Sequence, residues 1–191
     1  MCELFKKHIF NNLNNEIRLK VLDFVSTENK MKRFLYGRNK YSAELANIIE
    51  IDGFIDDFTV IKTWNNKQVY KINEVPRDSL VVNCTFSISP VTLSKRIDEF
   101  FPNGALEYSN LLSVFPYFIP VPDFIKEQQS DFLSNKIKYL NLYNALSDEP
   151  SKQLFIDLMR YRCTGDIANM NLYSIRPTEQ YFEDFLNLPK D

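Results

Sequence analysis

The sequence contains few histidines and cysteines, and each shortage excludes a class of site. His8 is the single histidine among 191 residues, which removes most Ser-His, Cys-His and zinc-histidine mechanisms because no second histidine is present to build them. Cys2, Cys84 and Cys163 are odd in number and lack the spacing of metal ligands. We therefore expect free thiols in a reducing cytoplasm, and we predict no metal site.

The sequence also lacks an excess of one charge and long apolar runs. The formal net charge is −2 with acidic and basic residues interspersed, so the basic stripe that binds a nucleic-acid backbone is missing. No apolar run approaches the roughly 20 residues of a membrane-spanning helix. The first residues carry no apolar signal-peptide region, which argues against secretion. We expect a cytoplasmic protein with no nucleic-acid partner and no membrane span.

Residues 33–57 carry the most informative pattern that is present. A short apolar run stops at Gly37, apolar residues then recur near helical spacing over 43–49, and a second apolar strand ends on Asp56 and Asp57. A strand, a glycine turn, a helix and a second strand form the opening unit of a nucleotide-binding α/β fold. The helix would direct its N-terminal amides at phosphate.

The glycine pattern of this unit is incomplete. Aligned on Gly37, the dinucleotide fingerprint places Asn39 and Ser42 where its second and third glycines belong. Asn39 can adopt a left-handed backbone, but its side chain would obstruct the approach of a pyrophosphate. NAD is therefore disfavoured, whereas a mononucleotide, a sugar nucleotide and a scaffold that binds nothing all stay open.

The strand ends of such a fold converge on a set of candidate ligand-binding residues. Arg38 and the amides near Tyr41 would meet phosphate, and a carboxylate would accept from ribose hydroxyls, although a solvated turn explains the two acids equally well. A serine from the loop after the central strand would bond a sugar or a base. The candidates are Gly37, Arg38, Asn39, Asp56, Asp57, Ser87 and Ser89.

No catalytic residue is predicted within this set. Asp56 and Asp57 are adjacent, and adjacent residues of a strand point to opposite faces of the sheet, so the two carboxylates cannot easily share one substrate proton. A free-standing enzyme that uses them as acid and base is the weakest hypothesis.

Other segments continue the alternation of strands and helices that begins in residues 33–57. Helical spacing predicts one amphipathic helix over 3–25, and apolar runs predict strands over 68–70, 80–86 and 105–108. Asn65-Asn66 marks a turn before the strand over 68–70. Ser89 would cap a helix that begins near Pro90. The alternation of strands and helices predicts an α/β, Rossmann-like, mainly parallel sheet with flanking helices.

The pattern becomes helical after about residue 120. We expect a Rossmann-like domain with its N-terminal helix over 1–120 and an α-helical C-terminal appendage over 121–191. One apolar stripe runs over 124–143, and a second follows Pro150 after a cap at Ser147 or Asp148. Gly165 would end the second helix, and a short third stripe lies near 181–186.

Two isolated features favour structural roles. Cys84 lies within an apolar strand, where a packed thiol is favoured over a reactive one. Arg160 and Arg162 would suit an acidic ligand, but their helical spacing favours surface charges.

Several segments resemble one family. Residues 146–152, 158–162 with Gly165-Asp166, and 179–182 resemble the segment that leads into the catalytic domain of FkbM-type S-adenosylmethionine-dependent methyltransferases. Residues 36–82 look like the Rossmann-like domain that precedes it in many bacterial members. The resemblance covers about residues 33–186.

The resemblance implies O-methylation of a saccharide or similar glycoconjugate. The family's donor site includes an Asp-x-Gly-x-x-x-Gly turn, and the four glycines of this sequence are isolated from one another. We therefore expect a non-catalytic recognition or positioning domain, with S-adenosylmethionine bound by a missing catalytic domain rather than by this chain. The alternative is an interaction or oligomerisation scaffold, such as a homodimer, without a small-molecule ligand.

Overall fold

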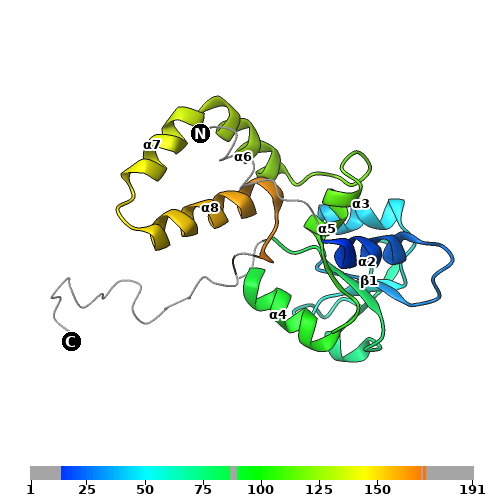
Figure 1. Ribbon diagram of the computed structural model, residues 1–191. Coiled ribbons are helices and arrows are strands. Elements are labelled where there is room, and N and C mark those ends of the chain that lie inside the picture. The colour runs from blue at the N-terminus through cyan, green and yellow to red at the C-terminus, as the bar shows by residue number, and fades with distance from the viewer. Residues whose placement is uncertain (1–13, 87–89, 169, 171–191) are drawn as a thin grey trace.

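The computed structural model describes residues 14–86, 90–168 and 170, and these form an α/β fold (Figure 1). Six strands make one sheet in the order β3-β4-β2-β1-β5-β6, in which every neighbouring pair is parallel except the antiparallel β3–β4 pair. The predicted mainly parallel, Rossmann-like sheet is confirmed. The strands are β1 (Arg33–Tyr36), β2 (Gly53–Ile55), β3 (Thr63–Trp64), β4 (Lys67–Tyr70), β5 (Leu80–Asn83) and β6 (Ala105–Glu107).

Helices cover both faces of this sheet (Figure 1). Leu35, Phe54 and Val82 pack against helices α2 (Asn15–Val25), α3 (Lys40–Ile48) and α5 (Tyr108–Val114). Their neighbours along the same strands point to the opposite face, where α4 (Pro90–Phe100) and the short 3-10 helix η1 (Ile72–Glu74) cover them. Strands buried on both faces read as continuous apolar runs, which explains the pattern seen in the sequence.

Strands are added to the sheet on both sides of β1, and this strand order positions the site. The strands β2 and β4 lie on one side of β1, and β5 and β6 lie on the other. The order therefore reverses between β1 and β5, and open α/β sheets bind ligands in the crevice at such a switch point, beyond the carboxyl ends of the strands.

Asparagine residues set the start of one helix and form one turn. The prediction of one continuous helix over 3–25 is wrong, because Asn14 is extended (φ −64°, ψ 143°) and its side chain accepts from the Glu16 amide at 2.7 Å, so α2 begins at Asn15. Residues 1–13 lie outside the described part. The turn predicted at Asn65-Asn66 is confirmed, with φ of 49° and 60°, values suited to a tight hairpin turn.

Two predicted strands end earlier than expected. The strand over 80–86 stops at Asn83, whose side-chain oxygen accepts from both the amide and the hydroxyl of Thr85. The strand over 105–108 stops at Glu107 because Tyr108 begins α5, a helix that the sequence pattern did not indicate. Cys84 is buried as predicted, and burial raises the pKa of its thiol well above the usual value.

Three helices follow α5 in the described residues: α6 (Asp123–Ser134), α7 (Lys136–Ala145) and α8 (Glu149–Thr164). The single stripe over 124–143 is interrupted at Asn135, which ends α6 with φ −118° and ψ 25°. The ends of α8 are confirmed: Asp148 caps it by accepting from the Ser151 amide, and Gly165 closes it at φ 74°. Phe132 and Met159 belong to a cluster separate from the sheet's cores.

The boundary near residue 120 stays a prediction, and so does the short helix near 181–186, which lies outside the described residues. Arg160 differs from expectation: its side chain is buried on α8 beside Asp157, at 3.8 Å, so it is not a surface charge. Among the helices of the described ranges, none is long and apolar enough to cross a lipid bilayer.

Candidate functional site

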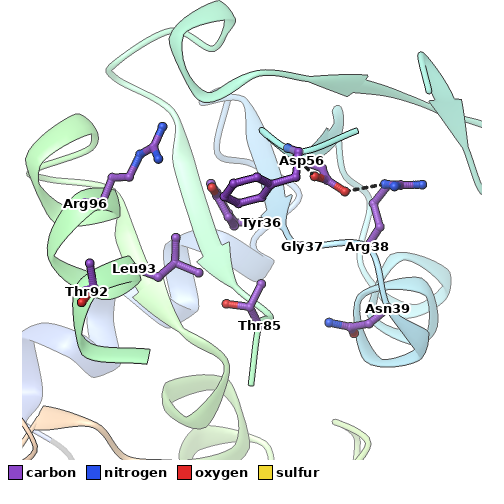
Figure 2. A pocket seen from close by; sticks show the side chains of 10 residues that line it. Tyr36, Gly37, Arg38, Asn39, Asp56, Thr85, Thr92, Leu93 and Arg96 are labelled. Atoms are coloured by element: carbon purple, nitrogen blue, oxygen red, sulfur yellow. Dashed lines mark hydrogen bonds and ion pairs between the residues drawn. The ribbon is translucent and has the colours of Figure 1, made fainter. Parts of the chain in front are cut away.

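A cavity of about 390 Å³ lies at the carboxyl ends of β1, β2 and β5, against α4 (Figure 2). We call it the switch-point pocket, because it occupies the crevice where the strand order reverses. Four of the candidate residues from the sequence line it, together with six that were not predicted. The lining consists of Tyr36, Gly37, Arg38, Asn39, Asp56, Phe58, Thr85, Thr92, Leu93 and Arg96.

Gly37 forms the turn that follows β1. Its amide donates to the Ile55 carbonyl at 2.9 Å, and its φ of +97° falls where only glycine is unstrained. A Cβ at this position would lie 2.4 Å from Cγ2 of Thr85. Both the backbone conformation and the close approach of the next strand's turn therefore require glycine here.

Asn39 caps α3 and uses the amides that were expected to meet phosphate. Its Oδ1 accepts from the amides of Tyr41 (3.0 Å) and Ser42 (3.1 Å), and its Nδ2 donates to the Cys84 carbonyl at 2.7 Å. Its backbone is extended (φ −149°, ψ 176°), so the left-handed conformation considered from the sequence is wrong. The N-terminus of α3 is thus satisfied by the protein's own side chain.

Asp56 and Arg38 meet at the edge of the pocket. The Nε of Arg38 donates to Oδ2 of Asp56 at 2.7 Å, and both side chains are largely shielded, at 20% and 16% exposure. The other oxygen of Asp56 accepts from the Phe58 amide at 2.9 Å. Figure 2 shows the Asp56–Arg38 pair beside Tyr36, across the pocket from α4.

Asp57 does not line the pocket, although it was a candidate. One of its oxygens accepts from the Tyr36 hydroxyl at 2.8 Å and from Nη2 of Arg96 at 2.9 Å, and the other accepts from the Ile72 amide at 2.8 Å. Burial, and then the bond to Asp57, raise the pKa of Tyr36 above its usual value. Tyr36 is therefore a neutral donor, and Asp57 is fully engaged in holding Tyr36 and Arg96.

Lys71 supports the loop that carries both carboxylates. Its ammonium donates to the carbonyls of Asp57 (2.8 Å) and Asp56 (3.3 Å), and it also contacts the Thr59 carbonyl. The loop places Phe58 at the pocket with 78% of the residue exposed. The two acids, two arginines and Lys71 give this group a formal charge of +1.

Most of the six unpredicted lining residues lie on strands or helices that the sequence predicted, but no local pattern marked them as ligand-binding residues. Thr92 and Arg96 lie four residues apart on α4, so they share one face of the helix beside Leu93. That helical spacing is the signal that would have grouped them. The predicted Ser87 and Ser89 lie outside the described residues.

Two further features lie outside the pocket. Burial raises the pKa of Glu107, at the end of β6, to about 8. Hydrogen bonds from Ser94 and Asn83 act in the opposite direction and lower this pKa. A smaller hollow of about 230 Å³ between α6 and α8 is lined partly by Asp131 and Arg162. The described ranges contain no group of three or more side chains suited to a metal ion.

Comparisons with known proteins identify a solved structure of similar fold. No protein-family model matches the sequence, and no curated protein sequence matches it significantly. The structure is similar to the crystal structure of methyltransferase FkbM from Methylobacillus flagellatus KT, with a TM-score of 0.54 and 14% identity over 99% of this chain and 53% of that chain. This chain thus spans about half the length of that protein. At this identity the likeness shows that the two chains share an α/β fold.

Proposed function

We propose that the switch-point pocket binds a nucleoside diphosphate or a sugar nucleotide. In this proposal the chain is a non-catalytic recognition or positioning domain of an FkbM-type methyltransferase that acts on saccharide or glycoconjugate acceptors. The observation that carries the proposal is the joint placement of Asp56, Arg96 and Phe58 around one cavity. Asp56 supplies a hydrogen-bond acceptor for sugar hydroxyls, Arg96 supplies a cation for phosphate, and Phe58 supplies an aromatic surface for a base.

Asp56 supports the ribose or sugar part of the ligand. It follows Gly37 by 19 residues and comes directly after β2, the place of the acid that bonds a ribose hydroxyl in Rossmann folds. Each of its carboxylate oxygens accepts one protein hydrogen bond, and a carboxylate offers about four lone-pair sites. Capacity for ligand hydroxyls therefore remains.

The size of the cavity and the cap on α3 favour a mononucleotide over NAD. Its volume of about 390 Å³ lies toward the small end of the roughly 300–1,000 Å³ typical of ligand pockets. Asn39 fills the helix N-terminus where a dinucleotide's pyrophosphate would bind.

S-adenosylmethionine fits this lining poorly. Its sulfonium and ammonium groups are positive, whereas the pocket presents Arg38 and Arg96 against the single carboxylate of Asp56. The proposal therefore assigns the methyl donor to a separate catalytic domain, which would be a partner of this chain. The buried thiols of Cys84 and Cys163 suit a reducing cytoplasm.

An interaction scaffold is the second candidate, and the exposed apolar surface of the C-terminal helices favours it. Leu133, Ile137 and Leu142 are 54%, 75% and 52% exposed, and α7 has no fully buried residue. Such a surface suits a second copy or a catalytic domain. Sedimentation velocity should show self-association that Ile137→Gln with Leu142→Gln removes and Lys138→Gln retains; a monomer at all concentrations would count against the homodimer.

Titration calorimetry tests the nucleotide proposal. Uridine and guanosine diphosphates and their sugar conjugates should bind with dissociation constants of about 1 mM or tighter, ahead of NAD and S-adenosylmethionine. Asp56→Asn should weaken binding about tenfold, because a charged hydrogen bond contributes about 1.5–3 kcal/mol. Glu50→Gln, which removes an exposed carboxylate outside the pocket, should leave binding unchanged. Tighter binding of either cofactor would reject the proposal.

A further inference from the structure

The capped N-terminus of α3 leaves the phosphate of a bound nucleotide without its usual partner. The amides of Tyr41 and Ser42 already donate to Asn39, so the helix does not present them to a ligand. Cationic side chains can meet the negative charge of a phosphate in place of these two amides. The lining offers two guanidinium groups, those of Arg38 and Arg96.

The two arginines are oriented differently. Arg38 directs its Nε to Asp56, and Figure 2 shows its Nη end pointing away from Tyr36. Arg96 extends from α4 toward Tyr36 and is 44% exposed. Its Nη2 contacts Asp57, and a guanidinium has five N–H donors, so further donors are available to a phosphate. Of the two cations, Arg96 is the more exposed, at 44% against 20% for Arg38, so its remaining donors are the more accessible to a ligand.

Asp57 holds Arg96 in this orientation. Its side chain is 12% exposed and is itself anchored by the Ile72 amide and the Tyr36 hydroxyl. A long side chain that is ordered before binding loses less conformational freedom when it binds. The ammonium of Lys71 donates to the Asp57 carbonyl. Its charge keeps the group around Arg96 net positive although Asp57 neutralises one charge.

We infer that Arg96 binds the phosphate of the nucleotide and that Asp57 is its positioning residue. This rests on the proposed function, and it adds that the affinity of the ligand depends on its phosphate groups. Because guanidinium and phosphate match in planar, two-point geometry, the contribution of Arg96 is specific to arginine and only partly replaced by lysine.

The test compares uridine diphosphate with uridine by calorimetry at low and high salt, with the guanosine pair in parallel. The wild type should bind the diphosphate at least about tenfold more tightly, as expected for charge-assisted hydrogen bonds. Arg96→Gln should remove this preference and its salt dependence while leaving nucleoside affinity unchanged. Arg96→Lys should retain part of the preference for the diphosphate, and Asp57→Asn should reduce this preference about threefold to tenfold. Lys95→Gln, the adjacent exposed residue on α4, should change neither quantity.

The outcomes separate the inference from the function on which it rests. If nucleotides bind and Arg96→Gln retains the preference, or if Arg38→Gln removes it instead, the inference is wrong and the proposed function stands. If neither nucleosides nor nucleotides bind the wild type, both are overturned. Thermal melts of each variant establish that Asp57→Asn, which loses a charged partner of Arg96, remains folded during the titration.

Discussion

Asp56 and Asp57 are neighbours in the chain, yet their carboxylates hold different arginines. Asp56 pairs with Arg38 of the β1–α3 turn at 2.7 Å, and Asp57 pairs with Arg96 of α4 at 2.9 Å. Successive side chains at a strand end point to opposite faces of the sheet, so one carboxylate lines the pocket and the other accepts from the Tyr36 hydroxyl. The pair acts as two separate anchors and not as an acid–base couple.

Gly37→Ala should destabilise the protein by about 2–4 kcal/mol, because the strained φ costs about 1–3 kcal/mol and the new Cβ collides with Thr85. Thr85→Ser removes the colliding methyl, so the double variant should recover part of the loss but retain the backbone strain. Urea unfolding of the two single variants and the double variant measures both terms. A loss below about 0.5 kcal/mol in Gly37→Ala would contradict the prediction.

Asn39→Ala should cost about 1–2 kcal/mol, the range for loss of an N-cap, since the amides of Tyr41 and Ser42 lose their acceptor. Asn39→Ser keeps a capping oxygen but not the bond to the Cys84 carbonyl, so it should fall between the wild type and the alanine variant. Chemical denaturation gives the order, and equal stability of all three proteins would show that the cap is unimportant.

Glu107 should make stability fall with rising pH. Its pKa is about 8 in the folded protein against about 4.3 in an unfolded chain, so the folded state holds the proton more tightly. The free energy of unfolding should decline from about pH 4.5 to about pH 8 and change little above that. The groups facing it are Ser94 and Asp98 of α4, Asn83 of β5 and Asp166 after α8.

Glu107→Gln should flatten this decline and make the variant more stable than the wild type at pH 9. Removing an unfavourable buried charge is worth about 1–3 kcal/mol. Urea unfolding at pH 6, 7, 8 and 9 measures the free energy of unfolding of both proteins. Glu99→Gln, at an exposed position, is the control. Parallel curves for the wild type and Glu107→Gln would refute the prediction.

Phe58→Ala should weaken nucleotide binding and leave stability nearly unchanged. Stacking of a base on an aromatic ring is worth about 1–3 kcal/mol, or roughly fivefold to hundredfold in affinity. Phe58 is 78% exposed, so its removal should alter the free energy of unfolding by less than about 0.5 kcal/mol. Val60→Ala, at 92% exposure on the same loop, is the matched control. Calorimetry with uridine diphosphate decides, and identical affinities for both variants would exclude stacking.

The elements that the sequence predicted correctly are those with strong local chemistry. The glycine turn at Gly37, the turn at Asn65-Asn66 and the cap at Asp148 depend on residues within a few positions of each other. Two of the misplaced helix ends lie at asparagine. Periodicity continues through Asn14 and Asn135, whereas α2 begins only after Asn14, and α6 ends at Asn135 before α7 begins.

The pocket also combines features that local sequence determines with features that tertiary packing determines. The order of strands and helices, the turn at Gly37 and the acid at Asp56 follow from periodicity and turn chemistry, which act over short separations in the chain. Arg96 joins them only through packing, since α4 must lie across the sheet face formed by Phe34 and Val81 before its side chain can reach Asp57. Likewise, only the folded structure assigns the α3 amides to Asn39 and leaves the arginines as the pocket's cations, because contacts between distant segments depend on which surfaces the core brings together.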